Sequence, residues 1–175
     1  MAGSPPRRRG PRRPLAAPFR GAPRWRMAYD TDALLDLWTA PPDDDAAASA
    51  AFRALYTDPV VVNGVPLTAS DLVTRARALR AALADPEREV LELVEDGDKV
   101  VVAFRLTGRH VGPLGSALGA VPATGRTVSM RVVDVLTLEG GRIARIQMVA
   151  DELGLLLQAG AVALVDPGPP SPAAG

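Results

Sequence analysis

Cysteine is absent from this chain of 175 residues, and histidine occurs once. The absence of cysteine excludes disulfide bonds, thiolate catalysis and cysteine metal sites. A single histidine is too few for a zinc site of the kind that histidines build. No apolar run approaches the roughly 20 residues that a membrane-spanning helix needs. We therefore expect a protein that uses no metal or organic cofactor and does not enter a membrane.

Basic residues are scarce outside the N-terminal segment. Residues 1–26 hold eight of the 20 basic residues, all arginine, together with six prolines and no acidic residue. Such a composition cannot bury apolar surface, so we expect disorder here and in the stretch 166–175. The arginines suit a basic arm that contacts nucleic acid or an acidic surface, a targeting or export segment, or extra residues before a true start at Met27. The export interpretation lacks an apolar stretch, which favours a cytoplasmic location.

Acidic residues dominate once residues 1–26 are set aside, because the remainder has a net charge of −8. Nucleic-acid binding needs a basic face, so we expect none by the folded part of the chain. Residues 27–165 are about 140 in number, near the usual size of one domain with one core. We therefore expect a single domain over this range.

Apolar residues at helical spacing come first in the domain. Three helices are predicted: one after Asp30, one after Asp43–Asp45, and one capped by Thr68 or Ser70 and closed before Pro86. From Glu87 onward the apolar residues alternate with a period of two, which is typical of half-buried strands. The predicted strands are Val60–Val62, Val90–Leu93, Val100–Leu106, Val132–Leu138 and Arg142–Ala150. This order predicts an α+β domain, with N-terminal helices packed on a curved antiparallel sheet that forms a cone.

Five short segments carry a family pattern: the Gly97-Asp98 turn, Thr107–Gly112, Pro122–Arg126, Gly141–Ile143 and Asp151–Gly160. In this order and spacing, the segment from about Tyr56 to Val162 resembles the SnoaL-like polyketide cyclase family. That family belongs to the nuclear transport factor 2-like superfamily of cone-shaped α+β folds. The resemblance implies the same cone for this chain.

The resemblance also implies a chemistry. Family members that close polyketide rings use an aspartate at the position of Asp151 as general acid/base in an intramolecular aldol condensation, without metal or organic cofactor. It further implies a small apolar, carbonyl-containing substrate and a homodimer. The chain departs from the pattern at three positions, where two aromatic residues are replaced by Gln147 and Ala150 and a histidine by Asn63. These departures imply a roomier and more polar pocket wall.

Asp151 has two interpretations from its local sequence. It stands where the apolar strand Ile146–Ala150 meets the helical run Leu153–Leu157. An aspartate there is a good helix N-cap, contributing about 1 kcal/mol. Alternatively it is a carboxylate at the cone mouth, whose desolvation raises its pKa and suits it to acid/base catalysis.

Asp134 is a second candidate catalytic carboxylate. By the period of two it shares a strand face with Val132 and Leu136, so it points where apolar groups point. An ionised carboxylate there needs a partner or must stay neutral. The segment Val132–Leu136 is similar to the strand of ketosteroid isomerases that carries a protonated, hydrogen-bond-donating aspartate. The alternative is an ion pair with one of three arginines, Arg105, Arg131 or Arg145.

Four other residues are candidates for the site. His110 ends a predicted strand and either transfers protons near neutral pH or stabilises the turn. Asn63 orients a substrate carbonyl or serves a turn with Gly64. Gln147 lies either in the pocket or on the outside of the sheet, and Phe104 is a candidate substrate-binding side chain. The loop Gly112–Gly125 contains no lysine or phosphate-loop pattern and suits either a lid or a plain loop.

Two classes of function remain open. The first is a cofactor-independent cyclase or isomerase, in which Asp151 moves protons and Asn63, His110 or Gln147 polarises a carbonyl. The second is a non-catalytic module of the same fold that binds a small ligand or dimerises. An epoxide hydrolase of the same cone is disfavoured, because the strand Val101–Thr107 lacks the acidic residue that such enzymes carry.

Overall fold

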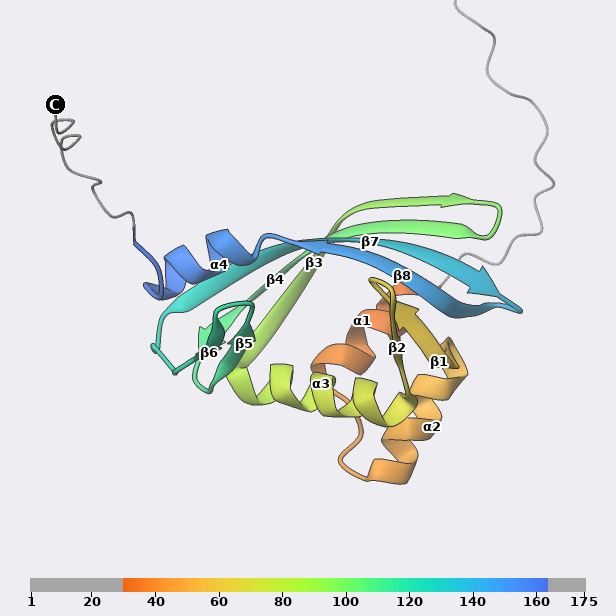
Figure 1. The fold of residues 1–175 in the computed structure, drawn as a ribbon, viewed down its shortest axis with the longest axis horizontal. Coiled ribbons are helices and arrows are strands. Elements are labelled where there is room, and N and C mark those ends of the chain that lie inside the picture. The colour runs from red at the N-terminus through yellow and green to blue at the C-terminus, as the bar shows by residue number, and fades with distance from the viewer. Residues whose placement is uncertain (1–29, 164–175) are drawn as a thin grey trace, which may run out of the picture.

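The computed structural model describes residues 30–163, which form one α+β domain (Figure 1). The predicted tails 1–26 and 166–175, and the predicted start at Met27, lie outside the described residues. Within the described range no helix is long and apolar enough to cross a membrane. The four helices found there are α1 (Thr31–Thr39), α2 (Asp45–Leu55), α3 (Ala69–Ala82) and α4 (Glu152–Ala159).

Polar side chains begin the first three helices, as the sequence predicts. The Asp30 carboxylate accepts a hydrogen bond from the Ala33 N–H, and that of Asp44 accepts one from the Ala47 N–H. For α3 the cap is Thr68, which forms a capping box with Asp71. Each cap satisfies N–H groups that have no partner inside the helix.

The main sheet has six strands in the order β2-β1-β8-β7-β4-β3. They are β1 (Tyr56–Val62), β2 (Val65–Leu67), β3 (Leu83–Asp96), β4 (Lys99–His110), β7 (Thr127–Glu139) and β8 (Arg142–Ala150). Their neighbours pair antiparallel, except that β1 and β8 run parallel. The predicted sheet was antiparallel throughout, so this parallel pair is a correction. A separate hairpin joins β5 (Leu114–Ser116) and β6 (Gly119–Val121).

Strand β3 begins earlier than the alternation from Glu87 predicted. It starts at Leu83, directly after α3, and includes Pro86. The backbone is irregular there: Asp85 has φ 49° and the pairing with β4 shifts between Ala84 and Glu87. Because β3 is an edge strand, this segment can accommodate a proline, which has no N–H to donate.

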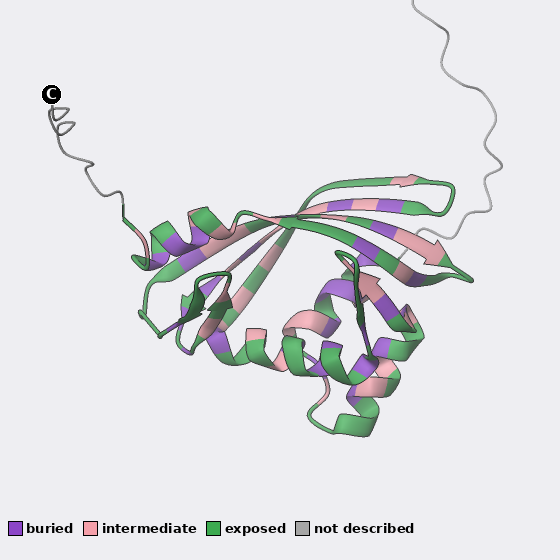
Figure 2. Ribbon diagram, viewed as in Figure 1, coloured by how far each residue is buried: buried purple, intermediate pink, exposed green. Residues whose placement is uncertain are grey.

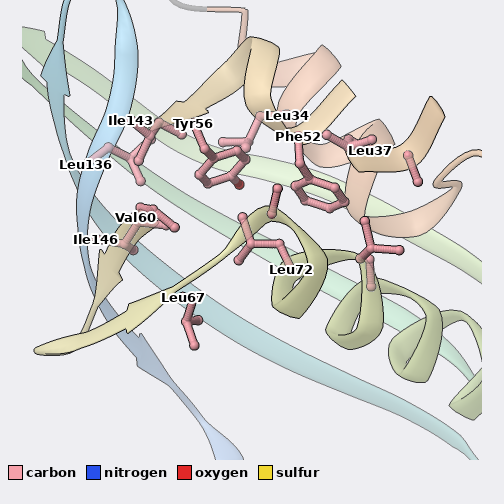
Figure 3. Close-up of a cluster of buried hydrophobic side chains, with 14 of the residues drawn as sticks. Leu34, Leu37, Phe52, Tyr56, Val60, Leu67, Leu72, Leu136, Ile143 and Ile146 are labelled. Carbon is pink, nitrogen blue, oxygen red and sulfur yellow. The ribbon is translucent and has the colours of Figure 1, made fainter. Parts of the chain in front are cut away.

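The sheet is curved, and α1–α3 lie on one side of it (Figure 1). We call the sheet face that they cover the inner face and the opposite face the outer face. Buried residues concentrate where these helices meet the sheet (Figure 2). Figure 3 shows the rings of Phe52 and Tyr56 near Leu72 of α3, with Leu136 and Ile146 among the sheet residues of this cluster.

The buried apolar residues form two clusters. The first lies between α1–α3 and the sheet and includes Phe52, Val102 and Leu136. In it the Trp38 Nε1–H donates to the Tyr56 hydroxyl over 2.7 Å. The second cluster joins α4 to the other end of the sheet and consists of Ala82, Leu83, Leu106, Val128, Leu155 and Ala159. The middle of the inner face lies between these two clusters.

Candidate functional site

Asp134 lies on the inner face between the two apolar clusters. Along the sheet it pairs with Val102 of β4 and Met148 of β8, so these three side chains share one face. Val102 is fully buried and belongs to the first cluster. On the same face of β7, Leu136 follows Asp134 by two residues and belongs to the first cluster. Met130 precedes Asp134 by four residues and packs against the second cluster. The strand alternation therefore places a carboxyl group in an otherwise apolar row.

The carboxyl of Asp134 lacks the partner that an ionised group needs. Its Oδ1 is buried without a hydrogen-bond partner among the described residues. Burial raises the pKa of Asp134 from 3.8 to about 6, because desolvation disfavours the charged form. Such a carboxyl can both accept and return a proton near neutral pH, which is what acid/base catalysis requires.

The arginines predicted as ion-pair partners of Asp134 are placed elsewhere. Arg105 binds Glu89 over 2.5 Å. Arg131 pairs with Arg105, and Arg145 pairs with Thr137, so by alternation both lie on the outer face, opposite to Asp134. Within residues 30–163 no ion pair of Asp134 is found, and the ion-pair interpretation is wrong.

Asp151 is the N-cap of α4, and it is exposed. Its Oδ1 accepts a hydrogen bond from the Gly154 N–H over 2.9 Å. A Cβ atom on Gly154 would come within 2.4 Å of the Oδ2 of Asp151, so the carboxylate rests directly on this glycine. The backbone N–H of Asp151 donates to the Arg131 carbonyl. The geometry therefore matches the capping interpretation of this residue.

His110 is fully buried at the end of β4. Its Nδ1 lies 3.0 Å from the Thr124 hydroxyl, while its Nε2 is buried without a partner among the described residues. Its backbone N–H donates to the Arg126 carbonyl, and its carbonyl accepts from the Gly125 N–H, both over 2.8 Å. His110 thus holds the segment Thr124–Arg126 against the end of β4, which matches the turn-stabilising interpretation.

Asn63 forms the turn between β1 and β2 together with Gly64. Both residues have positive φ, 47° and 84°, as in the tight turns of two-residue hairpins. The Asn63 side chain accepts from the Met148 N–H over 2.8 Å and donates to the Met148 carbonyl over 3.0 Å. The amide is therefore engaged by backbone, which favours the turn interpretation over carbonyl orientation.

Gln147 and Phe104 lie on opposite faces of the sheet. Gln147 is exposed and pairs with Val135, on the outer face. Phe104 is half-buried, pairs with Val132 on the inner face, and packs against the first cluster. The structure thus brings Phe104 and Asp134 onto one face and excludes Gln147 from it.

Two side chains in the same row as Asp134 were not predicted from the sequence: Met148 is its direct neighbour, and Leu93 lies beyond Val102. Met148 and Leu93 are 41% and 40% exposed. They offer an apolar surface that solvent, and hence a ligand, can reach. Met148 follows Gln147 on β8, so the period of two places it on the opposite face, and this is the signal that could have identified it.

A pocket of about 310 Å³ lies at the other end of the domain. It is bounded by the β5–β6 hairpin, the Pro122–Thr124 segment and the C-terminal end of α4, and none of the six candidate site residues lines it. Within residues 30–163 no group of three or more histidine, aspartate or glutamate side chains is arranged to hold a metal ion.

Comparisons with known proteins agree with the fold. A family model described as SnoaL-like polyketide cyclase matches residues 32–159. The structure of TsrD from Streptomyces laurentii is similar, with 25% identity, a TM-score of 0.62, and coverage of 75% of this chain and 92% of that one. A SnoaL-like polyketide cyclase from Agrobacterium tumefaciens is similar at 20% identity and a TM-score of 0.59, covering 75% of this chain and 98% of that one.

A third similar structure is described differently. AclR from Streptomyces galilaeus, a provisionally assigned hydroxylase, is 22% identical with a TM-score of 0.56, and the match covers 76% of this chain and 96% of that one. No curated protein matches the sequence. The same fold is thus described with more than one chemistry, and the site must decide the activity.

Proposed function

Since the chain belongs to the SnoaL-like polyketide cyclase family, we propose that it is a cofactor-independent cyclase or isomerase acting on a polyketide-like or other enolisable carbonyl substrate. Asp134 is the observation that carries this proposal. A carboxyl with a raised pKa, an unpartnered oxygen and an apolar surrounding is suited to exchange a proton with a carbon acid.

In the proposed reaction the ionised Asp134 removes a proton from a carbon next to a substrate carbonyl, which gives an enolate. In a cyclisation, the enolate carbon attacks a second carbonyl of the same molecule, and a carbon–carbon bond forms. The new alkoxide takes the proton back from Asp134, so the carboxylate is restored. In an isomerisation the proton returns to a different atom of the same enolate. Neither route consumes a co-reactant.

Neighbouring side chains support this role. Phe104 and Met148 flank Asp134 on the inner face and provide apolar contact for the substrate skeleton. Asp151, the acid/base position implied by the family, is a second candidate, and its capping bond to Gly154 leaves its other oxygen for proton exchange.

The test uses 1,3-diketone polyketide mimics and follows exchange of their α-protons for deuterium by NMR, so it needs no knowledge of the natural substrate. The wild-type protein should accelerate exchange, and Asp134→Asn should abolish the acceleration. Asp151→Asn tests the second candidate carboxylate in the same assay, and Gln147→Ala, on the outer face, is the control. If Asp134→Asn retains full activity, Asp134 is not the proton-exchange group.

A non-catalytic ligand-binding module is the second candidate function. It is favoured by one observation, that the carboxylate at the family's acid/base position is exposed and caps α4. Such a module would bind the diketones without exchanging their protons, in the wild type and in both variants alike. Binding by calorimetry together with the exchange assay distinguishes the two functions.

We further propose that the protein is a cytoplasmic homodimer. The outer face carries exposed valines at its centre, Val133, Val135 and Val149, which are 42%, 37% and 73% exposed. It also carries opposite charges on strands to either side of β7, Glu92 on the edge strand β3 and Arg145 on β8. A two-fold axis through β7 would bring the acidic side of one protomer over the basic side of the other. Sedimentation should show a dimer that Val149→Asp dissociates and that Val65→Asp, a control at the exposed strand β2, leaves intact.

A further inference from the structure

The pocket of about 310 Å³ lies apart from Asp134. Its walls include Leu118 and Val121 from the β5–β6 region, Leu156 and Ala159 from α4, and Thr124. The volume is near the lower end of the roughly 300–1,000 Å³ range of small-molecule sites. The walls combine apolar side chains with polar groups, and Thr124 is the polar residue among them whose side chain contacts a buried residue, His110.

The hydrogen bonds of Thr124 identify what it offers to a ligand. Its Oγ1 lies 3.0 Å from His110 Nδ1 and also accepts a long hydrogen bond, 3.5 Å, from the Arg126 N–H. The neutral imidazole carries its proton on either Nδ1 or Nε2. The Nε2 is buried and has no partner among the described residues, so the position of the proton decides which kind of group is left unpaired.

We assign the proton to Nδ1. A proton on Nε2 would leave a buried N–H donor without an acceptor. Among backbone groups, orphaned buried donors are rarer than under-satisfied acceptors, and we apply the same preference to the ring. With the proton on Nδ1, His110 donates to the Thr124 oxygen. The Thr124 oxygen then accepts from both His110 and the Arg126 N–H, and its own hydroxyl proton is left to donate.

The hairpin that closes this pocket is fixed to α4. The Ala117 N–H donates to Glu152 Oε1 over 2.6 Å, and the Ser116 hydroxyl donates to the Gly119 carbonyl over 2.7 Å. The first bond holds the turn of the hairpin against the start of the helix whose other end lines the pocket. The pocket is therefore bounded by elements that are connected to each other.

We propose that this pocket binds a small apolar molecule bearing a carbonyl or ether oxygen, which accepts the hydrogen bond of the Thr124 hydroxyl. The apolar body of the ligand contacts Leu118, Val121 and Leu156. The site goes beyond the proposed acid/base function, since it uses neither Asp134 nor Asp151. His110 is a positioning residue here, because it orients Thr124.

The test is a titration of the ¹⁵N-labelled protein with acetophenone and with ethylbenzene, which differ mainly in the carbonyl. Acetophenone should shift the amide signals of Ala120, Gly160 and Ala161, and it should bind about two- to tenfold more tightly than ethylbenzene, the ratio expected for one neutral hydrogen bond. Largest shifts at Phe104, Val132 and Met148 instead would place the ligand at the inner-face centre and overturn the proposal.

Three variants separate the contributions. Thr124→Val keeps the shape but removes the hydroxyl, so the preference for acetophenone should disappear, and Thr124→Ser should restore it. Ala120→Trp, at an exposed residue that lines the pocket, should block both ligands and keeps the test decisive if Thr124→Val does not fold. Retained preference in Thr124→Val, or unchanged binding in Ala120→Trp, would overturn the proposal.

Asp134→Asn separates this site from the proposed function. It should leave acetophenone binding at Ala120 and Gly160 unchanged, whatever it does to proton exchange. Loss of exchange with retained binding supports both proposals, while retained exchange with retained binding overturns only the acid/base role of Asp134.

Discussion

Asp134 lies in the middle of β7 and Asp151 directly follows β8, and the surroundings of these two carboxylates are opposite. Asp134 is half-buried in an apolar row, and its buried Oδ1 has no hydrogen-bond partner among the described residues. Asp151 is exposed and its oxygen caps α4. The capping bond stabilises the fold, whereas the unpartnered group is a cost to the fold that a function would explain.

Exchanging each carboxylate for an amide should show the difference most strongly in catalysis. Asp134→Asn should lower the rate of α-proton exchange by about 10²- to 10⁴-fold, the usual contribution of a general acid or base. Asp151→Asn should retain most of the rate, because an asparagine also caps a helix. The exchange assay checks both. A larger loss in Asp151→Asn than in Asp134→Asn would reverse the assignment.

The pH dependence of stability should sharpen the comparison. The pKa of Asp134 is raised in the folded protein, so the unfolded chain loses this proton first as the pH rises. Below the pKa of the unfolded chain, protonated Asp134 contributes its whole stabilisation, roughly 3 kcal/mol. This contribution is lost as the pH rises from about 4 to about 6. Urea denaturation of wild type and Asp134→Asn at pH 4 and pH 7 measures it.

In this experiment the loss of unfolding free energy between pH 4 and pH 7 should be smaller in Asp134→Asn than in the wild type. At pH 7 the variant should be the more stable protein. An identical pH dependence in both proteins would mean that Asp134 is paired or hydrated in solution. Asp151→Asn serves as the control for replacing a carboxylate elsewhere in the chain.

Removing the cap should have a smaller effect. Asp151→Ala deletes the acceptor of the Gly154 N–H, so the free energy of unfolding should fall by about 1 kcal/mol. Asp151→Ser keeps a capping oxygen and should recover most of this loss. Denaturant titrations measure both. No loss in Asp151→Ala would contradict the capping role and strengthen the catalytic one.

The smallest effect is expected on the outer face. Gln147→Ala should change the exchange rate by less than about twofold, because its side chain lies across the sheet from Asp134. Met148→Ala, one residue along on the inner face, should raise the KM for apolar diketones, since it removes contact area. Steady-state kinetics compares the two variants. If only Gln147→Ala raised the KM, the substrate would bind on the outer face, which would contradict the proposed site.

Local rules predicted much of the domain. The helix caps at Asp30 and Thr68 and the inward orientation of Asp134 follow from neighbouring residues and from the period of two. The parallel pairing of β1 with β8 joins residues more than 80 positions apart, and no local pattern encodes it. The two interpretations of Asp151 and of Asn63 also depended on contacts that only the folded chain brings together.

The same limit applies to Asp134. Its face was predictable, and the same alternation along β7 puts Arg131 on the opposite face. The faces of Arg105 and Arg145 were not predictable, because they depend on how β4 and β8 pair with β7. Pro86 was taken as a boundary by its residue type, and the position of β3 at the sheet edge allows the strand to include it.

The Asn63 amide binds both the N–H and the carbonyl of Met148. Residue Met148 lies just beyond the stretch of β8 that pairs with β1, whose last partners are Val62 and Ile146. Backbone groups left open there would be a template on which a strand of another chain could add, the first step of edge-to-edge aggregation. One side chain thus occupies the place of the next strand residue and protects the protein from self-association at that point.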